Sequence, residues 1–147
     1  MQFLRGLHAA QAAQRPAGLN HSGWELVLHM SAWTVEVRRR LAGHSPGEPA
    51  DGDWPPIPEL ATETAWASAL EHLEHAHGAL IADVERLGPA DLDRLVGDTR
   101  EPALGTGVTV GAMLVGLAQH DAYHTGQLAL LRQLMAAGEA AVERAKS

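Results

Sequence analysis

The fold and the candidate site both depend on the stretch Gly116-Leu-Ala-Gln-His-Asp-Ala-Tyr-His-Thr-Gly-Gln-Leu-Ala-Leu-Leu131. Its apolar residues recur at intervals of three and four, which is typical of an amphipathic helix. His120 and His124 are four residues apart, so they share one helix face and two imidazoles can reach one metal ion. The same face carries apolar and amide residues that indicate an inward orientation, namely Met113, Leu117, Gln127, Leu131 and Leu134. Two histidines in a core need a metal ion or hydrogen-bond partners, because an unpaired buried polar group costs about 1–3 kcal/mol.

The composition narrows the class of protein. The chain has 147 residues, 46% of them hydrophobic, which predicts one domain over residues 1–147. The formal net charge of −7 argues against a nucleic-acid partner, which would require a basic surface. The sequence has no cysteine, so a metal ion would be held by histidine and carboxylate groups. We find neither a signal peptide nor an apolar run that could span a membrane, and we expect a cytoplasmic protein with no membrane partner.

The periodicity predicts four helices and no strand pattern longer than a few residues. Residues 43–58 contain five prolines and three glycines, which predicts a long loop. Four helices with one long crossover loop favour an all-α four-helix bundle. The expected helices cover residues 2–14, 23–41, 59–87 and 110 to 137 or 138.

Capping signals mark where two of these helices begin. Ser22 can accept a hydrogen bond from the backbone three residues on, and Glu25 can reach back, which forms a capping box for the second helix. We expect Thr109 to cap the last helix. The basic run at residues 38–40 is expected to end the second helix, where cations complement the helix dipole.

Most of the nine histidines need no special role. Three fall near helix ends or in loops and are expected to be exposed to solvent; they are His8, His21 and His44. The third helix carries three more, which alternate with acidic residues as on a solvated face; they are His72, His75 and His77.

His29 differs from these six because it borders the buried stripe of the second helix. Its neighbours on that helix include Met30 and Trp33. The pair His120 and His124 lacks a third ligand, and three histidines plus water would form an open site of the catalytic type, whereas structural zinc sites are closed by four protein ligands. The spacing alone leaves two interpretations open, a metal triad and ordinary core packing.

Five pieces of the sequence follow one another along the chain. They are His21-Ser-Gly-Trp-Glu-Leu-Val-Leu-His29-Met, Arg40-Leu-Ala-Gly43, Asp53-Trp-Pro, Thr64-Ala-Trp66 and His120-Asp-Ala-Tyr-His124-Thr-Gly-Gln127. In these pieces, which together span nearly the whole chain, the sequence resembles the DinB/YfiT-like superfamily of metal-binding four-helix bundles. The resemblance implies that His29, His120 and His124 are metal ligands. It also implies an up-down-down-up bundle in which the long loop is the crossover.

One divalent metal ion is the cofactor that this ligand set implies. An ion held by three neutral imidazoles keeps its charge, so it acts as a Lewis acid and lowers the pKa of bound water or thiol toward neutrality. Zinc, nickel and iron(II) all suit imidazole ligands. Proteins similar to this one include transferases that move a low-molecular-weight thiol, such as bacillithiol or mycothiol, onto an electrophile, and related bundles include a mycothiol-dependent isomerase. We therefore expect metal-dependent thiol transfer to a small-molecule substrate, with no catalytic side chain assigned.

Two alternative functions stay open. One is metal-dependent hydrolysis with Glu25 or Asp121 as general base, although Asp121 lies about 100° round the helix from His120. The other is a non-enzymatic stress- or metal-responsive binding protein. Gln127 and Tyr123 are candidates for contacts with the ligands, and an exposed hydroxyl is the stronger expectation for Tyr123. We expect a homodimer for two reasons. The helices carry more apolar residues than so short a first helix could cover, and helices with more than one apolar side need another partner. Dimers are also common among similar proteins.

Overall fold

The computed structural model describes the backbone of residues 4, 6–16 and 18–146, and the side chains of residues 139–143, 145 and 146 are not described. Its elements in chain order are α1 (Ala9–Ala13), α2 (Gly23–Leu41), α3 (Glu63–Val84), α4 (Pro89–Leu92), β1 (Leu95–Val96), β2 (Val108–Thr109) and α5 (Val110–Lys146). The predicted helical class is confirmed, with the addition of one small ladder. No helix in the described part of the chain combines the length and the apolarity that crossing a bilayer requires.

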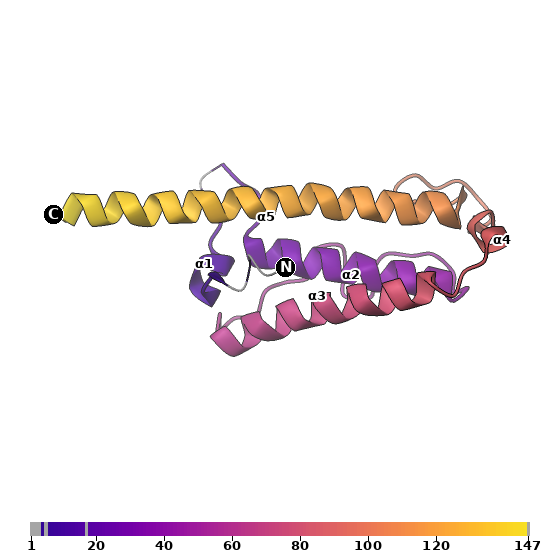
Figure 1. Cartoon of the computed structure of the whole chain (residues 1–147), viewed down its shortest axis with the longest axis horizontal. Helices are drawn as coiled ribbons and strands as arrows, with labels where there is room; N and C mark the ends of the chain where they lie inside the picture. Colours follow the sequence, from indigo (N-terminus) through magenta and orange to yellow (C-terminus); the bar gives the residue numbers. More distant parts are fainter. Residues whose placement is uncertain (1–3, 5, 17, 147) are drawn as a thin grey trace.

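Three long helices, α2, α3 and α5, make up the body of the molecule (Figure 1). α2 and α3 run in the same direction, and the loop of residues 42–62 returns along the molecule between them, whereas α5 runs the opposite way. α1 has only five residues and contacts α2 and α3. The complete four-helix, up-down-down-up arrangement therefore stays a prediction, because its first helix is so short in the described chain.

The first helix begins later than the sequence predicts. α1 starts at Ala9, whereas the apolar pattern placed the start at residue 2; residues 1–3 and 5 lie outside the described chain. Leu4 and Gly6 lie in a 3₁₀ turn, and glycine disfavours a continuous helix at this point. Leu4 and Leu7 are buried, so the pattern identified core residues although it misplaced the helix.

Side-chain caps fix the starts of α2 and α5 as predicted. Ser22 Oγ accepts a hydrogen bond from the backbone N–H of Glu25 at 3.2 Å, and the Glu25 carboxylate accepts one from the N–H of Ser22 at 2.8 Å. These two bonds form the expected capping box. Thr109 Oγ1 accepts a hydrogen bond from the N–H of Ala112 at 3.1 Å and caps α5.

Both ends of α3 and the end of α5 also differ from the prediction, and α3 ends at Val84 rather than at residue 87. α3 begins at Glu63 rather than residue 59, because Thr62 caps it by accepting a hydrogen bond from the N–H of Ala65 at 3.2 Å. α5 continues to Lys146 instead of ending at residue 137 or 138. An isolated glycine such as Gly138 costs a helix only about 1 kcal/mol, and the surrounding alanines favour its continuation.

The core consists of two apolar clusters at different levels of the bundle. The first joins Trp24 and Met30 of α2, Trp66 and Leu73 of α3, and Leu128 of α5, with further residues around them. The second lies where α2 and α3 end and α5 begins; its buried members are Val37, Val96, Val110, Met113 and Leu117. On α5, positions 120 and 124 fall between the two clusters. Leu134 is 45% exposed, so its predicted inward position is wrong. The C-terminal part of α5 extends past the other helices (Figure 1).

The segment between α3 and α5 is tied to the end of α2. It contains α4 and the antiparallel pair of β1 and β2, each strand only two residues long. The buried side chain of Arg40 pairs with Glu36 at 2.7 Å and donates to the backbone oxygens of Leu104 at 2.6 Å and Gly47 at 2.8 Å. α2 ends at Leu41, directly after the basic run, as predicted. Arg40 therefore holds two loops beside the start of α5.

Candidate metal centre

His29 from α2 and His120 and His124 from α5 come together inside the bundle. One ring nitrogen from each lies within 4.8 Å of the others. His29 and His124 are buried, with 5% and 7% of their surface exposed, and His120 is half-buried. The Nε2 atoms of His29 and His120 are 2.8 Å apart. The convergence expected from the inward faces and the family resemblance is therefore present, and the cluster could hold a metal ion.

The outer nitrogen of His29 is fixed by the crossover loop. His29 Nδ1 lies 2.6 Å from the backbone oxygen of Asp53, which can only accept, so Nδ1 carries the proton. The Asp53 carboxylate in turn accepts a hydrogen bond from Trp33 Nε1 at 2.6 Å. These two contacts set the ring orientation of His29 and leave its Nε2 unprotonated, with its lone pair free to bind a cation.

His120 is oriented by a carboxylate on the same helix. Its Nδ1 lies 3.1 Å from Asp121 Oδ1, and the other oxygen of Asp121 lies 2.9 Å from His77 Nε2 on α3. Burial raises the pKa of Asp121, but hydrogen bonds from His120 and His77 outweigh it, so the pKa ends below the usual range. Asp121 is therefore ionised, and it accepts the Nδ1 proton of His120. The prediction that His77 lies on a solvated face is wrong, because α3 turns it toward α5.

His124 is oriented by an amide one turn further along α5. Its Nδ1 lies 2.6 Å from Gln127 Oε1, while Gln127 Nε2 donates to the Tyr123 hydroxyl at 3.2 Å. Because the amide nitrogen is used by Tyr123, the amide oxygen faces the histidine and accepts its proton. Gln127 thus makes the predicted contact with a candidate ligand. Tyr123 is 65% exposed, as expected, and it touches the site through Gln127 and by an edge contact with the His124 ring.

The protonation pattern of the triad fits a bound cation. With every Nδ1 donating outward, the Nε2 atoms of His29 and His120 are lone pairs only 2.8 Å apart. Two such lone pairs repel unless a proton or a cation lies between them. Metal-bound histidines characteristically donate their other ring N–H to a carbonyl or carboxylate, and the donor set here has that form. The residues present therefore fit a divalent ion held by three neutral imidazoles.

Burial favours the neutral imidazoles that metal binding needs. Desolvation lowers the pKa of His29, and the neighbouring His120 and His124 lower it further. Desolvation also lowers the pKa of His124, opposed by its hydrogen bond to Gln127. A lowered histidine pKa keeps the ring neutral into mildly acidic solution, and the neutral ring is the form that binds metal.

A stack of three aromatic rings closes the loop over His29. Trp54 stacks on His29 with ring centroids 3.9 Å apart and on His21 with centroids 3.5 Å apart. The expectation that His21 is exposed to solvent is therefore wrong, because the loop folds back over it. The expectation of exposure is confirmed for His8, His44, His72 and His75. Sequence reasoning did not select Asp53, Trp54 or His77 as site residues, and the Asp53-Trp-Pro piece was the one available signal.

Neither carboxylate considered as a general base is free to act at the triad. Glu25 pairs with Arg15, whose Nε lies 2.8 Å from Glu25 Oε2, and it also closes the capping box. The expectation that Glu25 could face the site is therefore wrong. Both oxygens of Asp121 are used by His120 and His77.

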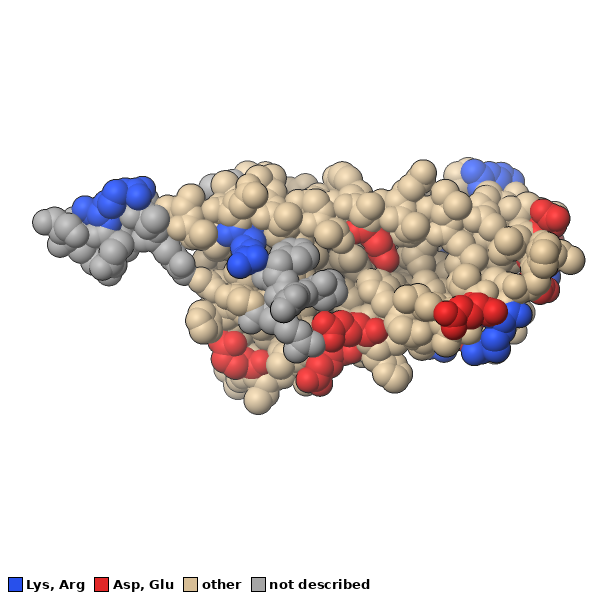
Figure 2. All heavy atoms as spheres, in the orientation of Figure 1, with Lys and Arg blue, Asp and Glu red and all other residues tan. Residues whose placement is uncertain are grey.

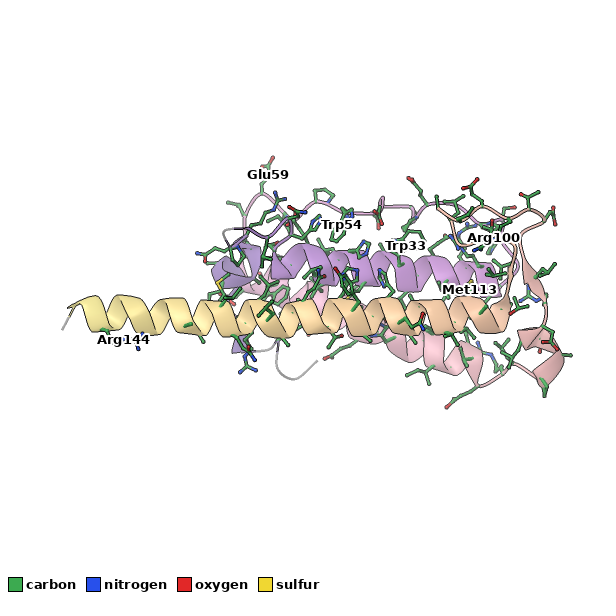
Figure 3. All side chains as sticks on the ribbon, turned by 90° about the horizontal axis from the view of Figure 1, so that it is seen from above. Trp33, Trp54, Glu59, Arg100, Met113 and Arg144 are labelled. Atoms are coloured by element: carbon green, nitrogen blue, oxygen red, sulfur yellow. The ribbon has the colours of Figure 1, made fainter. Side chains whose placement is uncertain are left out.

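Two cavities adjoin the triad. One, of about 430 Å³, has His120 in its wall together with residues of α2, of α5 and of the loop 102–105. The other, of about 420 Å³, has His124 and Gln127 in its wall together with His21, Trp54 and residues of α5. Figure 3 shows Trp54 and Trp33 at different points along the bundle, with Met113 toward the Trp33 end. Each cavity thus borders the triad at one histidine, His120 in the first and His124 in the second.

Comparisons with known proteins identify the family. The model of the DinB superfamily matches residues 1–128, which include all three histidines of the triad. No curated protein and no solved structure matches the chain. The family match covers most of the 147 residues and extends into α5. The chain therefore belongs to the DinB superfamily.

Proposed function

We propose that this protein is a metal-dependent transferase that moves a low-molecular-weight thiol onto an electrophilic small molecule. His29, His120 and His124 would hold one divalent ion through Nε2. The observation that carries the proposal is the convergence of three nitrogen lone pairs beside two cavities. Three protein ligands leave a coordination position open, and an open position distinguishes catalytic from structural sites.

The bound ion would supply Lewis acidity, which lowers the pKa of a thiol toward neutrality. In the transfer, the thiol loses its S–H proton to solvent, a bond forms between sulfur and the electrophilic carbon, and the leaving group departs with the electron pair of its broken bond. The chain has no cysteine, so the nucleophilic sulfur comes from the substrate. Asp53, Asp121 and Gln127 would keep the three imidazoles oriented through their Nδ1 protons.

The engaged carboxylates favour transfer over hydrolysis. The ion would lower the pKa of bound water as well as that of a thiol, but attack by water also benefits from a positioned base, and Glu25 and Asp121 are already held by other partners. A thiol of lowered pKa needs no strong base, because it is a nucleophile as its thiolate. Imidazole ligands suit zinc, nickel and iron(II).

The test begins with metal analysis of protein purified without chelator. Thiol transfer is then measured with N-acetylcysteine, mycothiol and bacillithiol, each with 1-chloro-2,4-dinitrobenzene as the electrophile. His124→Ala should lose metal and turnover together, whereas His75→Ala, at an exposed site on α3, should lose neither. Hydrolysis of esters or amides without added thiol, and no thiol transfer, would replace the proposal with the hydrolase alternative. Failure of both assays in metal-loaded protein would favour a binding protein.

A further inference from the structure

The two cavities lie on opposite sides of the triad along both of the helices that supply it. On α5, the first cavity is lined between residues 112 and 120, and the second between residues 123 and 131. On the α2 side, the first is lined by residues 33–40, and the second by Leu26 and the preceding residues 18–21. His29 lies on α2 between these two sets of residues and lines neither cavity. The triad therefore lies between the cavities, with His120 in the wall of one and His124 in the wall of the other.

The walls of the two cavities differ in chemistry. Trp33, Val37, Met113 and Leu117 line the first, and Arg40 in the same wall is already paired with Glu36 and two carbonyl oxygens. We call this the apolar cavity. It offers a hydrophobic ligand large contact area and few new hydrogen bonds.

The second cavity offers polar groups. Its wall contains Asn20, His21, Tyr123 and Gln127 beside leucine side chains, and we call it the polar cavity. Nδ1 of His21 is buried and has no hydrogen-bond partner within the described residues. The stack on Trp54 holds the plane of the His21 ring in the wall of this cavity. A buried polar atom of this kind is costly unless a ligand or water satisfies it.

We infer that the two cavities bind the two substrates of a group transfer at the same time, with the triad between them. The polar cavity takes the thiol, whose amino, carboxyl or hydroxyl groups bind His21 and its neighbours. The apolar cavity takes the hydrophobic electrophile. This assignment rests on the proposed function, because it divides the reactants of that reaction between two places. Sulfur and electrophilic carbon then meet at the triad, from opposite sides, without either substrate having to leave first.

The decisive experiment asks whether two probes compete. Co²⁺ is loaded into the protein, and N-acetylcysteine is titrated while sulfur-to-cobalt charge-transfer absorption is recorded. The titration is repeated in the presence of 1,3-dinitrobenzene, which resembles the electrophile but has no leaving group, and whose own binding is measured by quenching of tryptophan fluorescence. We expect the Kd of the thiol to change by less than about twofold, because the probes occupy different cavities. A thiol Kd that rises in proportion to the dinitrobenzene concentration would overturn the assignment, and so would failure of either probe to bind.

Two variants test which probe belongs to which cavity. His21→Phe keeps a ring on Trp54 but removes the nitrogen, and it should weaken N-acetylcysteine about tenfold, as loss of one hydrogen bond does, without affecting dinitrobenzene. Gly116→Leu fills the apolar cavity, where an added Cβ meets no atom within 4 Å, and should weaken dinitrobenzene only. Gly138→Leu, also on α5 and exposed, controls for the gain in helix propensity. Equal weakening of both probes by either cavity variant would count against two separate subsites.

The binding experiments test the two-cavity arrangement, whereas the thiol-transfer assay tests the proposed function. Probes that bind together in protein that shows no thiol transfer would leave the two cavities assigned and would reject the transferase. Thiol transfer with probes that exclude each other would support the transferase and reject the two-cavity arrangement.

Discussion

His77 Nε2 on α3 lies 2.9 Å from Asp121 Oδ2 on α5, so a helix that supplies no candidate ligand is nevertheless joined to His120 through one carboxylate. The link passes from His77 to Asp121 and from Asp121 to Nδ1 of His120. Groups that orient a metal ligand in this way influence affinity although they never touch the ion. α3 therefore contributes to the candidate metal centre by positioning and not by ligation.

The first prediction concerns this link. Asp121→Ala should weaken metal affinity by about 10–100-fold, the usual cost of losing such a partner, while the triad still binds metal supplied in excess. His77→Ala should have a smaller effect, and the double variant should be no weaker than Asp121→Ala alone, because His77 acts through Asp121. Competition with a chromophoric chelator measures all three. Glu71→Ala, at an exposed site on α3, is the control. Independent, additive losses from His77 and Asp121 would refute the link.

The second prediction is that metal binding stabilises the fold, because the triad joins α2 to α5. A ligand that binds only the native state adds about 2.7 kcal/mol at a hundredfold excess over its Kd. For a domain of this size, that corresponds to a rise in Tm of about 5–10 °C. Thermal unfolding with and without chelator measures the rise, which His124→Ala should abolish and His75→Ala should preserve. An unchanged Tm on chelation of protein shown beforehand to contain metal would contradict the prediction.

The third prediction is a loss of stability in acid that depends on Glu25. The hydrogen bond from Arg15 lowers the pKa of Glu25 to about 2 from its usual value of 4.5, against the effect of burial. Because the unfolded chain takes up this proton first, the pair stabilises the fold above pH 4.5, and the contribution is lost as the pH falls toward 2. The full effect is on the order of 3 kcal/mol.

Glu25→Gln tests the direction of this pH dependence of stability, because glutamine preserves the capping box and removes the charge. Urea unfolding should show the variant to be less stable than the natural chain at pH 7, and the difference should shrink steadily as the pH is lowered from about 4.5. Glu59→Gln, in the exposed part of the loop, should show no such trend. A difference that stays constant across this range would mean that the charge of Glu25 does not contribute.

The fourth prediction is a homodimer formed through the outer face of α5. From residue 110 to residue 138 this helix contains only two charged residues, Asp121 and Arg132, and Asp121 is turned inward. The surface over α5 in Figure 2 is correspondingly almost free of charge. Four large side chains on it are exposed, namely Val115, Tyr123, Leu130 and Leu134. A solvated helix face normally carries charges, so this face is suited to a second copy of the chain.

Sedimentation at micromolar concentration should therefore give twice the chain mass of 15.6 kDa. Val115→Glu and Leu134→Glu should each shift the protein toward monomer, because they place a charge in the interface. Ile81→Glu, at a similarly exposed apolar site on α3, should not. A natural chain that sediments only as monomer would exclude the dimer.

Helical periodicity is local, so it could place the three histidines on inward helix faces, whereas their assignment as metal ligands came from the family resemblance. The spacing of His120 and His124 fixes their shared face whatever else the chain does, and the position of His29 beside Met30 and Trp33 indicates an inward side chain. The same logic recovered the capping box of α2 and the start of α5. These features depend on backbone geometry over a few residues.

The contacts that orient the triad could not be derived in this way. The pairing of His77 with Asp121 depends on the rotation of α3 against α5, and glutamates beside His77 made a solvated face the natural interpretation. The stack of His21 on Trp54 depends on the path of a proline-rich loop, which periodicity does not constrain. β1 and β2 have two residues each, too few to show an alternating pattern.

The stacked Trp54 and the carbonyl of Asp53 make the crossover loop part of the candidate metal centre. Linkage requires that the factor by which opening of this loop weakens binding of the ion equals the factor by which the bound ion disfavours the open loop at equilibrium. Protease cutting or hydrogen exchange confined to residues 43–62 would then report metal occupancy without any assay of catalysis. The rate of cutting or exchange in this loop, which carries no ligand, would then indicate whether the metal ion is bound.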